Sequence, residues 1–210
     1  PITETLRAIG VVDLIAAKCR YGKQRSCLSP EIDADGRLEL HEARHPLLVE
    51  LFADAREGLP LREVVPIDVR LGDDFDVLVV TGPNTGGKTV TIKTIGLLAL
   101  MTQCGIPIPV GPGSRMPVFR EIFIDVGDEQ SLQQSLSTFS SHLAHLLEII
   151  RGSSPAALVL IDELGAGTDP DEGAAIGRAV IAELLNLKAK AIVTTHLSAL
   201  KAVAFTTPRV

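Results

Sequence analysis

The stretch TGPNTGGKTVTIKTIG, residues 81–96, gathers glycines, a proline and a lysine between the apolar run DVLVV and a second apolar stretch. It fits the pattern G-x-x-x-x-G-K-[ST] at Gly82, Gly87, Lys88 and Thr89. Glycines let the backbone curl until several N–H groups point inward, and a following helix adds its positive N-terminal end, so such a turn can hold phosphate oxygens. The lysine of this pattern reaches the β- and γ-phosphates and the threonine hydroxyl binds Mg²⁺. The residues predicted to form this phosphate cradle are Gly82, Pro83, Asn84, Thr85, Gly86, Gly87, Lys88, Thr89 and Val90. Taken alone, the motif also fits a strand-to-helix turn that binds nothing.

Two further apolar runs end in residues that could complete the chemistry. LVLIDE ends in Asp162 and Glu163, and AIVTTH ends in His196. Beside a bound triphosphate, Asp162 would hold the Mg²⁺ through water, and Glu163 would polarise the attacking water as general base. Ligands of parallel sheets bind at the carboxyl ends of the strands, so Lys88, Glu163 and His196 can converge on one phosphate. We therefore predict these three as catalytic residues, with His196 sensing the γ-phosphate.

The elements that must position these residues alternate along the chain from residue 64 onward. Apolar strands are expected within 64–71, 76–80, 117–126, 157–163 and 191–196, and helices over 87–104, 131–151 and 171–186. Continuously apolar strands separated by helices predict an α/β fold whose mostly parallel sheet is flanked by helices. Ahead of them we expect a helix over 1–18, a polar linker over 19–37, and short strands over 38–48 followed by a charged loop to about residue 61.

The composition narrows the class of protein. Aromatic residues make up 3 % of the 210 residues and hydrophobic residues 46 %, so the core must consist of Ala, Val, Ile and Leu. The net charge of -6 argues against nucleic-acid binding over the whole surface, because phosphate contacts need clustered Lys and Arg. Three cysteines form no disulfide framework, and no run has the length or apolarity of a membrane span or signal peptide, so we expect a cytoplasmic protein without a membrane partner. The chain begins with Pro1 rather than Met, which suggests a piece of a longer protein.

The order of the remaining motifs favours one class of phosphate-binding protein. A simple nucleotide kinase needs an Arg-rich lid, and residues 105–155 hold no cluster of arginines. The Ser-rich tract SLSTFSSHL ahead of the acid pair, GAGTDPDEG directly after it and TTH further on are typical of ABC ATPases, in which two nucleotide domains face each other. His142, His145 and Glu148 follow one another at a spacing of three residues and so share one face of a helix. This face could approximate a metal site, but it fits a polar surface of the dimer or domain better.

At this level of detail the chain resembles one family. The segments ARHPLL, TGPNTGGKT, STF, LIDELGAGTDP and TTH resemble the ATPase domain of the MutS family, and the likeness spans roughly residues 39–200. More narrowly, IFIDVGDEQSLQQSLSTFSSH and DELGAGTDPDEGAA resemble its second bacterial branch, the paralogue outside mismatch repair. Residues 1–28 resemble the tail of the preceding lever helices and a linker, which leaves 29–210 as the ABC-type P-loop ATPase domain, truncated at its C-terminal end.

The resemblance implies a composite site. Ser137 and Thr138 would approach the γ-phosphate bound by the opposite subunit of a homodimer, and Asp169 would lie at the dimer seam. Arg44 and His45 would lie near the adenine or ribose. Mismatch-repair relatives carry an aromatic residue for the base between that motif and the glycine-rich loop; residues 56–74 hold none, which leaves the base contact open.

Full-length members of this branch resemble clamps on branched DNA such as recombination junctions, and some act on stalled ribosomes. They usually end in a small Smr nuclease domain, which this chain lacks, so we expect neither DNA specificity nor nuclease activity of it. The sequence thus predicts a bacterial cytoplasmic domain that binds ATP and Mg²⁺ and hydrolyses ATP, slowly in isolation. Two alternatives stay open: a nucleotide-dependent dimerisation module with incidental turnover, and a small-molecule phosphotransferase.

Overall fold

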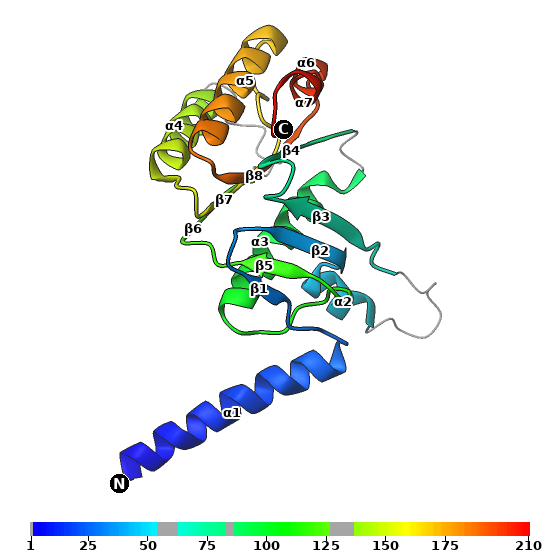
Figure 1. Ribbon diagram of the computed structural model, residues 1–210, viewed down its shortest axis with the longest axis vertical. Coiled ribbons are helices and arrows are strands. Elements are labelled where there is room, and N and C mark those ends of the chain that lie inside the picture. The colour runs from blue at the N-terminus through cyan, green and yellow to red at the C-terminus, as the bar shows by residue number, and fades with distance from the viewer. Residues whose placement is uncertain (1, 54–62, 83–85, 127–136) are drawn as a thin grey trace.

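A computed structural model describes residues 2–53, 63–82, 86–126 and 137–210 of the chain. Helix α1 (Ile2–Gln24) extends away from the body that the other elements form (Figure 1). It continues six residues beyond the predicted end at residue 18, because Lys, Arg, Tyr and Gln all tolerate a helix and Gly22 packs against Pro107. The polar linker predicted from residue 19 therefore starts only after Gln24, while the division of the chain at residue 28 stays a prediction.

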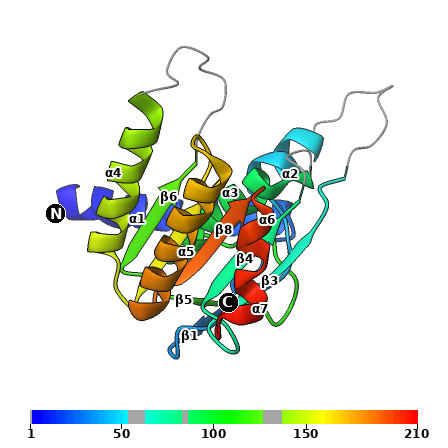
Figure 2. The ribbon, with the colours of Figure 1, turned by 90° about the horizontal axis from the view of Figure 1, so that it is seen from above.

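The centre of the body is a four-stranded parallel sheet. Its strands lie in the order β4 (Val77–Thr81), β8 (Lys190–Thr195), β7 (Ala157–Ile161) and β6 (Glu121–Asp125), and every neighbouring pair is parallel. Helix α3 (Lys88–Gln103) covers one face, and α4 (Ser137–Gly152), α5 (Pro170–Asn186), α6 (Ser198–Lys201) and α7 (Val203–Thr206) cover the other (Figure 2). The predicted α/β architecture with a parallel sheet flanked by helices is confirmed.

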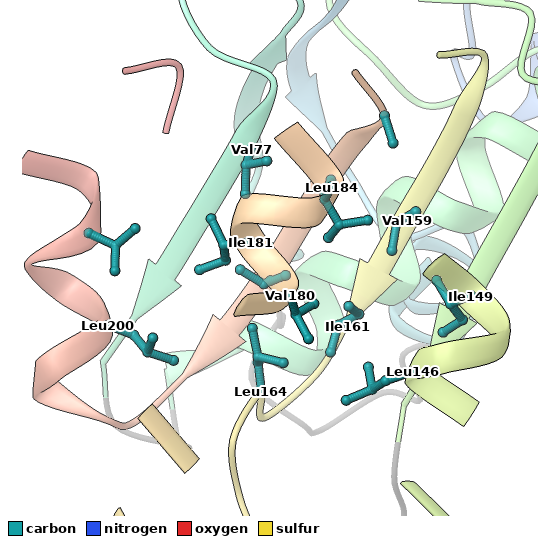
Figure 3. Close-up of a cluster of buried hydrophobic side chains, with 14 of the residues drawn as sticks. Val77, Leu146, Ile149, Val159, Ile161, Leu164, Val180, Ile181, Leu184 and Leu200 are labelled. Atoms are coloured by element: carbon teal, nitrogen blue, oxygen red, sulfur yellow. The ribbon is translucent and has the colours of Figure 1, made fainter. Parts of the chain in front are cut away.

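Strand β7 shows why these apolar runs form a two-sided sheet. All five of its residues are buried, and successive side chains point to opposite faces. Val159 and Ile161 join the core beneath α4 and α5, shown in Figure 3, whereas Leu158 and Leu160 join the core on the α3 side. A strand buried on both faces carries no polar alternation, which is the pattern that predicted it.

A second sheet lies against α3 and departs from the sequence-based expectation. It has the order β1 (Glu31–Asp33), β5 (Arg115–Pro117), β2 (Leu38–Ala43) and β3 (Ile67–Leu71), with β2 and β3 antiparallel. Residues 64–71, expected to alternate with helices in the parallel sheet, thus contribute a strand here instead. Helix α2 (Pro46–Ala53) replaces part of the predicted strand and loop, since Pro46 at the first helical position already has the φ that a helix needs.

Two observations bear on the environment of the chain. Within the described ranges, no helix is both long and apolar enough to cross a membrane. Cys19, Cys27 and Cys104 are all free thiols.

Candidate functional site

The glycine-rich turn joins β4 to α3, as the motif requires. Gly82 has φ 146° and Gly87 has φ 78°, values in the left-handed range that favours glycine, and Gly87 caps the 16-residue helix α3. Three residues of the predicted cradle, Pro83, Asn84 and Thr85, lie outside the described residues. Lys88 opens the helix with only 5 % of its surface exposed, and its ammonium donates to the Gly82 carbonyl. A buried cation is therefore held inside the turn, at the positive end of a helix, where an anion binds best.

The two predicted magnesium ligands lie together although they come from separate elements. The Thr89 hydroxyl at the start of α3 donates to Oδ2 of Asp162 at 2.5 Å. Asp162 follows β7 directly, is 6 % exposed, and donates its N–H to the Asp125 carbonyl at 2.8 Å. Hydroxyl and carboxylate oxygens are ligands that Mg²⁺ prefers, so the donor set at this point fits the ion.

The predicted general base stands on an unusual backbone. Glu163 has φ 54°, a conformation that residues other than glycine rarely adopt. Its N–H donates to the Thr194 hydroxyl of β8 at 2.8 Å. His196 follows the end of β8 and is exposed. Because β4, β7 and β8 are parallel neighbours in one sheet, Lys88, Glu163 and His196 all lie at its carboxyl edge.

Arg44 and His45, predicted together near the base or ribose, have different surroundings. His45 lines a hollow of ≈ 370 Å³ that also touches Gly86, Gly87 and Val90, while Arg44 directs Nη1 to the Glu42 carbonyl at 3.1 Å and does not line the hollow. Burial, reinforced by the charge of Lys93, lowers the pKa of His45, so its imidazole is neutral at pH 7. Its Nδ1 is buried and has no hydrogen-bond partner among the described residues. His45 thus lines the hollow with its imidazole ring, while Nδ1 itself is covered from solvent.

Sequence reasoning missed the apolar wall of this hollow. Leu48 and Phe52 of α2, with Val65 and Ile67, form this apolar wall, and the polar residues of the lining besides His45 are Glu63, Thr91 and Thr94. Phe52 lies just ahead of residues 56–74, the stretch found to lack an aromatic side chain, so its position in the chain was a usable signal. The hollow has the apolar wall and scarce polar groups of a small-molecule site.

The residues predicted at a dimer seam occupy helix starts. Ser137 and Thr138 fall in the first turn of α4. Asp169 is exposed and caps α5, its carboxylate accepting the Asp171 N–H at 3.0 Å. A local capping role accounts for an aspartate here, so the seam assignment stays a prediction.

The histidines of α4 form no metal cluster with other described residues. Among these residues, no group of three or more His, Cys, Asp or Glu side chains could hold a metal ion. His142 instead places Nδ1 3.1 Å from Oδ2 of Asp125, at the end of β6. The contact with the Asp125 carboxylate, which outweighs burial, raises the pKa of His142.

The parallel sheet, the glycine-rich turn and the paired threonine and aspartate define a mixed α/β protein with a candidate phosphate site at one sheet edge. The family model described as MutS domain V matches residues 78–210, and the chain belongs to the MutS family. This confirms the family predicted from the motifs.

Its relatives include proteins named Endonuclease MutS2. That of Pelotomaculum thermopropionicum is 50 % identical over 210 residues, and those of Symbiobacterium thermophilum and Geobacillus kaustophilus are 47 % and 46 % identical over 209 residues. Each alignment covers 100 % of this chain and 25 % of the relative, so the chain spans about a quarter of the length of these proteins.

Proposed function

We propose that this chain is a P-loop ATPase domain of the ABC type that binds Mg-ATP and hydrolyses it to ADP and phosphate. The observation that carries the proposal is the Thr89 hydroxyl at 2.5 Å from the buried Asp162 carboxylate, directly beside Lys88 at the start of α3. A turn that bound nothing would need neither a buried cation nor a buried acid at the same sheet edge.

Each residue at the edge has a distinct task in this proposal. Lys88 and the amides of the turn would neutralise the β- and γ-phosphates. Thr89 would bind Mg²⁺ and Asp162 would hold it through water, and the ion would supply a charge that polarises the phosphate oxygens. Glu163 accepts the proton of the attacking water, and His196 orients the γ-phosphate from the end of β8. The same cradle could also hold ATP without cleaving it.

The hollow beside the cradle is the proposed site for the base and ribose. It lies between α2, β3 and the start of α3, so a nucleotide whose phosphates occupy the turn has its base end there. Phe52 and Leu48 offer an apolar wall for a purine face, and the neutral imidazole ring of His45 adds to the lining beside the cradle. Arg44 is not assigned a contact in this arrangement.

At the level of the whole protein we propose a homodimer that closes on ATP. Ser137, Thr138 and Asp169 would then meet the nucleotide of the opposite subunit, and closure would drive a clamp on branched DNA or on the ribosome in the bacterial cytoplasm. The relatives' name, Endonuclease MutS2, supports a DNA-associated role. No cleavage of DNA is proposed for the site at this sheet edge.

Two other functions share the cradle. A dimerisation module would use ATP only as a ligand that stabilises the paired state, with incidental turnover. A phosphotransferase would pass the γ-phosphate to a small acceptor instead of water. The three differ in what Glu163 does, because only hydrolysis needs a base for water.

The test compares wild type, Glu163→Gln and Lys88→Ala in nucleotide binding, phosphate release and sedimentation with and without Mg-ATP. We expect Glu163→Gln to keep ATP affinity, to lose at least about 100-fold in phosphate release, and to form a dimer with Mg-ATP. We expect Lys88→Ala to bind no ATP. Wild-type levels of phosphate release in Glu163→Gln would reject the hydrolytic assignment, and undiminished ATP affinity in Lys88→Ala would reject the cradle.

A further inference from the structure

Thr194, near the end of β8, contacts both members of the acid pair. It is 0 % exposed, and its hydroxyl donates to Oδ1 of Asp162. The same oxygen accepts the N–H of Glu163 at 2.8 Å. Its main chain joins the same turn, since its carbonyl accepts the Leu164 N–H at 2.8 Å.

These two bonds use the single donor of the hydroxyl and one of its two acceptor lone pairs. The two oxygens of Asp162 are thereby held by different threonines, Oδ2 by Thr89 of α3 and Oδ1 by Thr194 of β8. Glu163 has φ 54°, and such a conformation persists only where its surroundings fix it. The Thr194 hydroxyl is one of the groups that fix the Glu163 backbone, and it also bonds to the Asp162 carboxylate. This hydroxyl therefore affects the direction of both acidic side chains.

We propose that Thr194 is a positioning residue, whose hydroxyl aims Asp162 at Mg²⁺ and Glu163 at the attacking water. The inference rests on the ATPase function proposed above. Thr194 touches neither nucleotide nor water in this role; it acts through the two acids, and it links them to the strand that ends in His196. The orientation of the acid pair and the position of the proposed phosphate sensor thus depend on one strand.

The next residue supplies a matched control. Thr195 is also 0 % exposed, and its hydroxyl also makes two bonds, donating to the Leu164 carbonyl at 3.0 Å and accepting the Leu197 N–H at 3.1 Å. Neither bond involves Asp162 or Glu163. A change to valine removes the same hydroxyl and keeps the same shape at both positions, so the difference between the two variants isolates contact with the acid pair.

The experiment measures ATP turnover against ATP and against Mg²⁺ concentration for wild type, Thr194→Val, Thr194→Ser and Thr195→Val, with thermal unfolding of each. We expect Thr194→Val to lower kcat by about tenfold or more and to raise the Mg²⁺ concentration at half-maximal rate, because Asp162 loses a charge-assisted hydrogen bond. The KM for ATP should change much less, since Lys88 and the cradle are intact. Thr194→Ser should recover the wild-type kcat and Mg²⁺ dependence, and Thr195→Val should lower stability alone.

The outcomes separate this inference from the proposed function. Equal kcat and Mg²⁺ dependence in the two valine variants, with an active wild type, would overturn the role of Thr194 and leave the ATPase intact. A wild type that never turns over ATP would overturn both. If Thr194→Val does not fold, Thr194→Ala is compared with Thr194→Ser, because those two differ only in the hydroxyl, and equal rates would again reject the role.

Discussion

A buried charge cluster at the opposite edge of the parallel sheet yields the most quantitative prediction. Asp76 precedes β4, and its side chain is 7 % exposed. It accepts Lys190 Nζ at 2.7 Å and Arg209 Nε at 2.5 Å, which ties the last residues of the chain to the start of β8. The change Asp76→Asn keeps the size of the side chain and removes its charge.

The loss in the free energy of unfolding caused by Asp76→Asn depends on how exposed its partners Lys190 and Arg209 are. Breaking a fully buried ion pair costs about 3–5 kcal/mol, because the remaining charge is left without a counter-ion. Lys190 is 13 % exposed and cannot rehydrate, whereas Arg209 is 46 % exposed and can, so we take the lower end, about 3 kcal/mol. For a chain of this size that corresponds to a fall in Tm of about 6–12 °C. The control is Asp74→Asn, whose carboxylate is 73 % exposed beside Arg70 and should cost less than about 1 kcal/mol.

The pH dependence of this loss is a second readout of the same variant. Burial alone would raise the pKa of Asp76, but the hydrogen bonds from Arg209 and Lys190 outweigh it and leave the pKa below its usual value. The carboxyl is thus harder to protonate in the folded chain than in the unfolded chain. The contribution of Asp76 to the free energy of unfolding is complete above the unfolded pKa of about 3.9 and disappears as pH falls through the folded pKa. Urea unfolding should show the full difference at pH 7 and a smaller one below pH 4; the same small cost for Asp76→Asn and Asp74→Asn at pH 7 would refute the reasoning.

Two further predictions concern the surroundings of the candidate site. A Cβ on Gly173 would overlap the Gly165 carbonyl oxygen, so Gly173→Ala should cost about 2 kcal/mol or more in urea unfolding. Gly167→Ala has open space around it and only its φ of 87° to strain, which should cost about 1–2 kcal/mol. A smaller cost for Gly173→Ala than for Gly167→Ala would contradict the close contact between helix α5 and the backbone at Gly165. The ion pair with Asp125 raises the pKa of His142, so that pair stabilises the fold fully below the unfolded pKa of about 6.5 and loses its effect as pH rises through the folded value. His142→Gln should therefore destabilise the chain more at pH 5.5 than at pH 8.5, and a pH-independent difference would contradict the ion pair.

The local parts of the site were predictable because their signals are local. Glycines at fixed spacing before a lysine identify a turn that needs left-handed backbone, and Gly82 and Gly87 adopt it. Apolar runs identified all four strands of the parallel sheet. The pairing of Thr89 with Asp162 then follows from the rule that ligands meet at the carboxyl ends of parallel strands.

The parts that were missed depend on partners distant in sequence. β5 has three residues, and its strand character comes from pairing with β1 and β2 rather than from any pattern of its own. Arg44 and His45 are neighbours in the chain, yet only His45 faces the hollow, because what lies opposite each side chain is set by α2 and α3. The position of Phe52 in the chain could have suggested it for the base, but only the placement of α2 beside the cradle shows that it lines the hollow.

Strand β8 shows why stability and turnover can be tested separately in this chain. Its first residue, Lys190, belongs to the Asp76 cluster, and its fifth, Thr194, holds the acid pair. Four steps along the extended strand separate them by about 13 Å, far enough for perturbations at the two ends to act independently. To sequence reasoning both threonines of TTH are merely good strand formers. Their bonding partners distinguish them. Thr194 bonds to the acid pair, which fits the positioning role proposed for it, whereas Thr195 bonds to the backbone of Leu164 and Leu197, which fits a structural role.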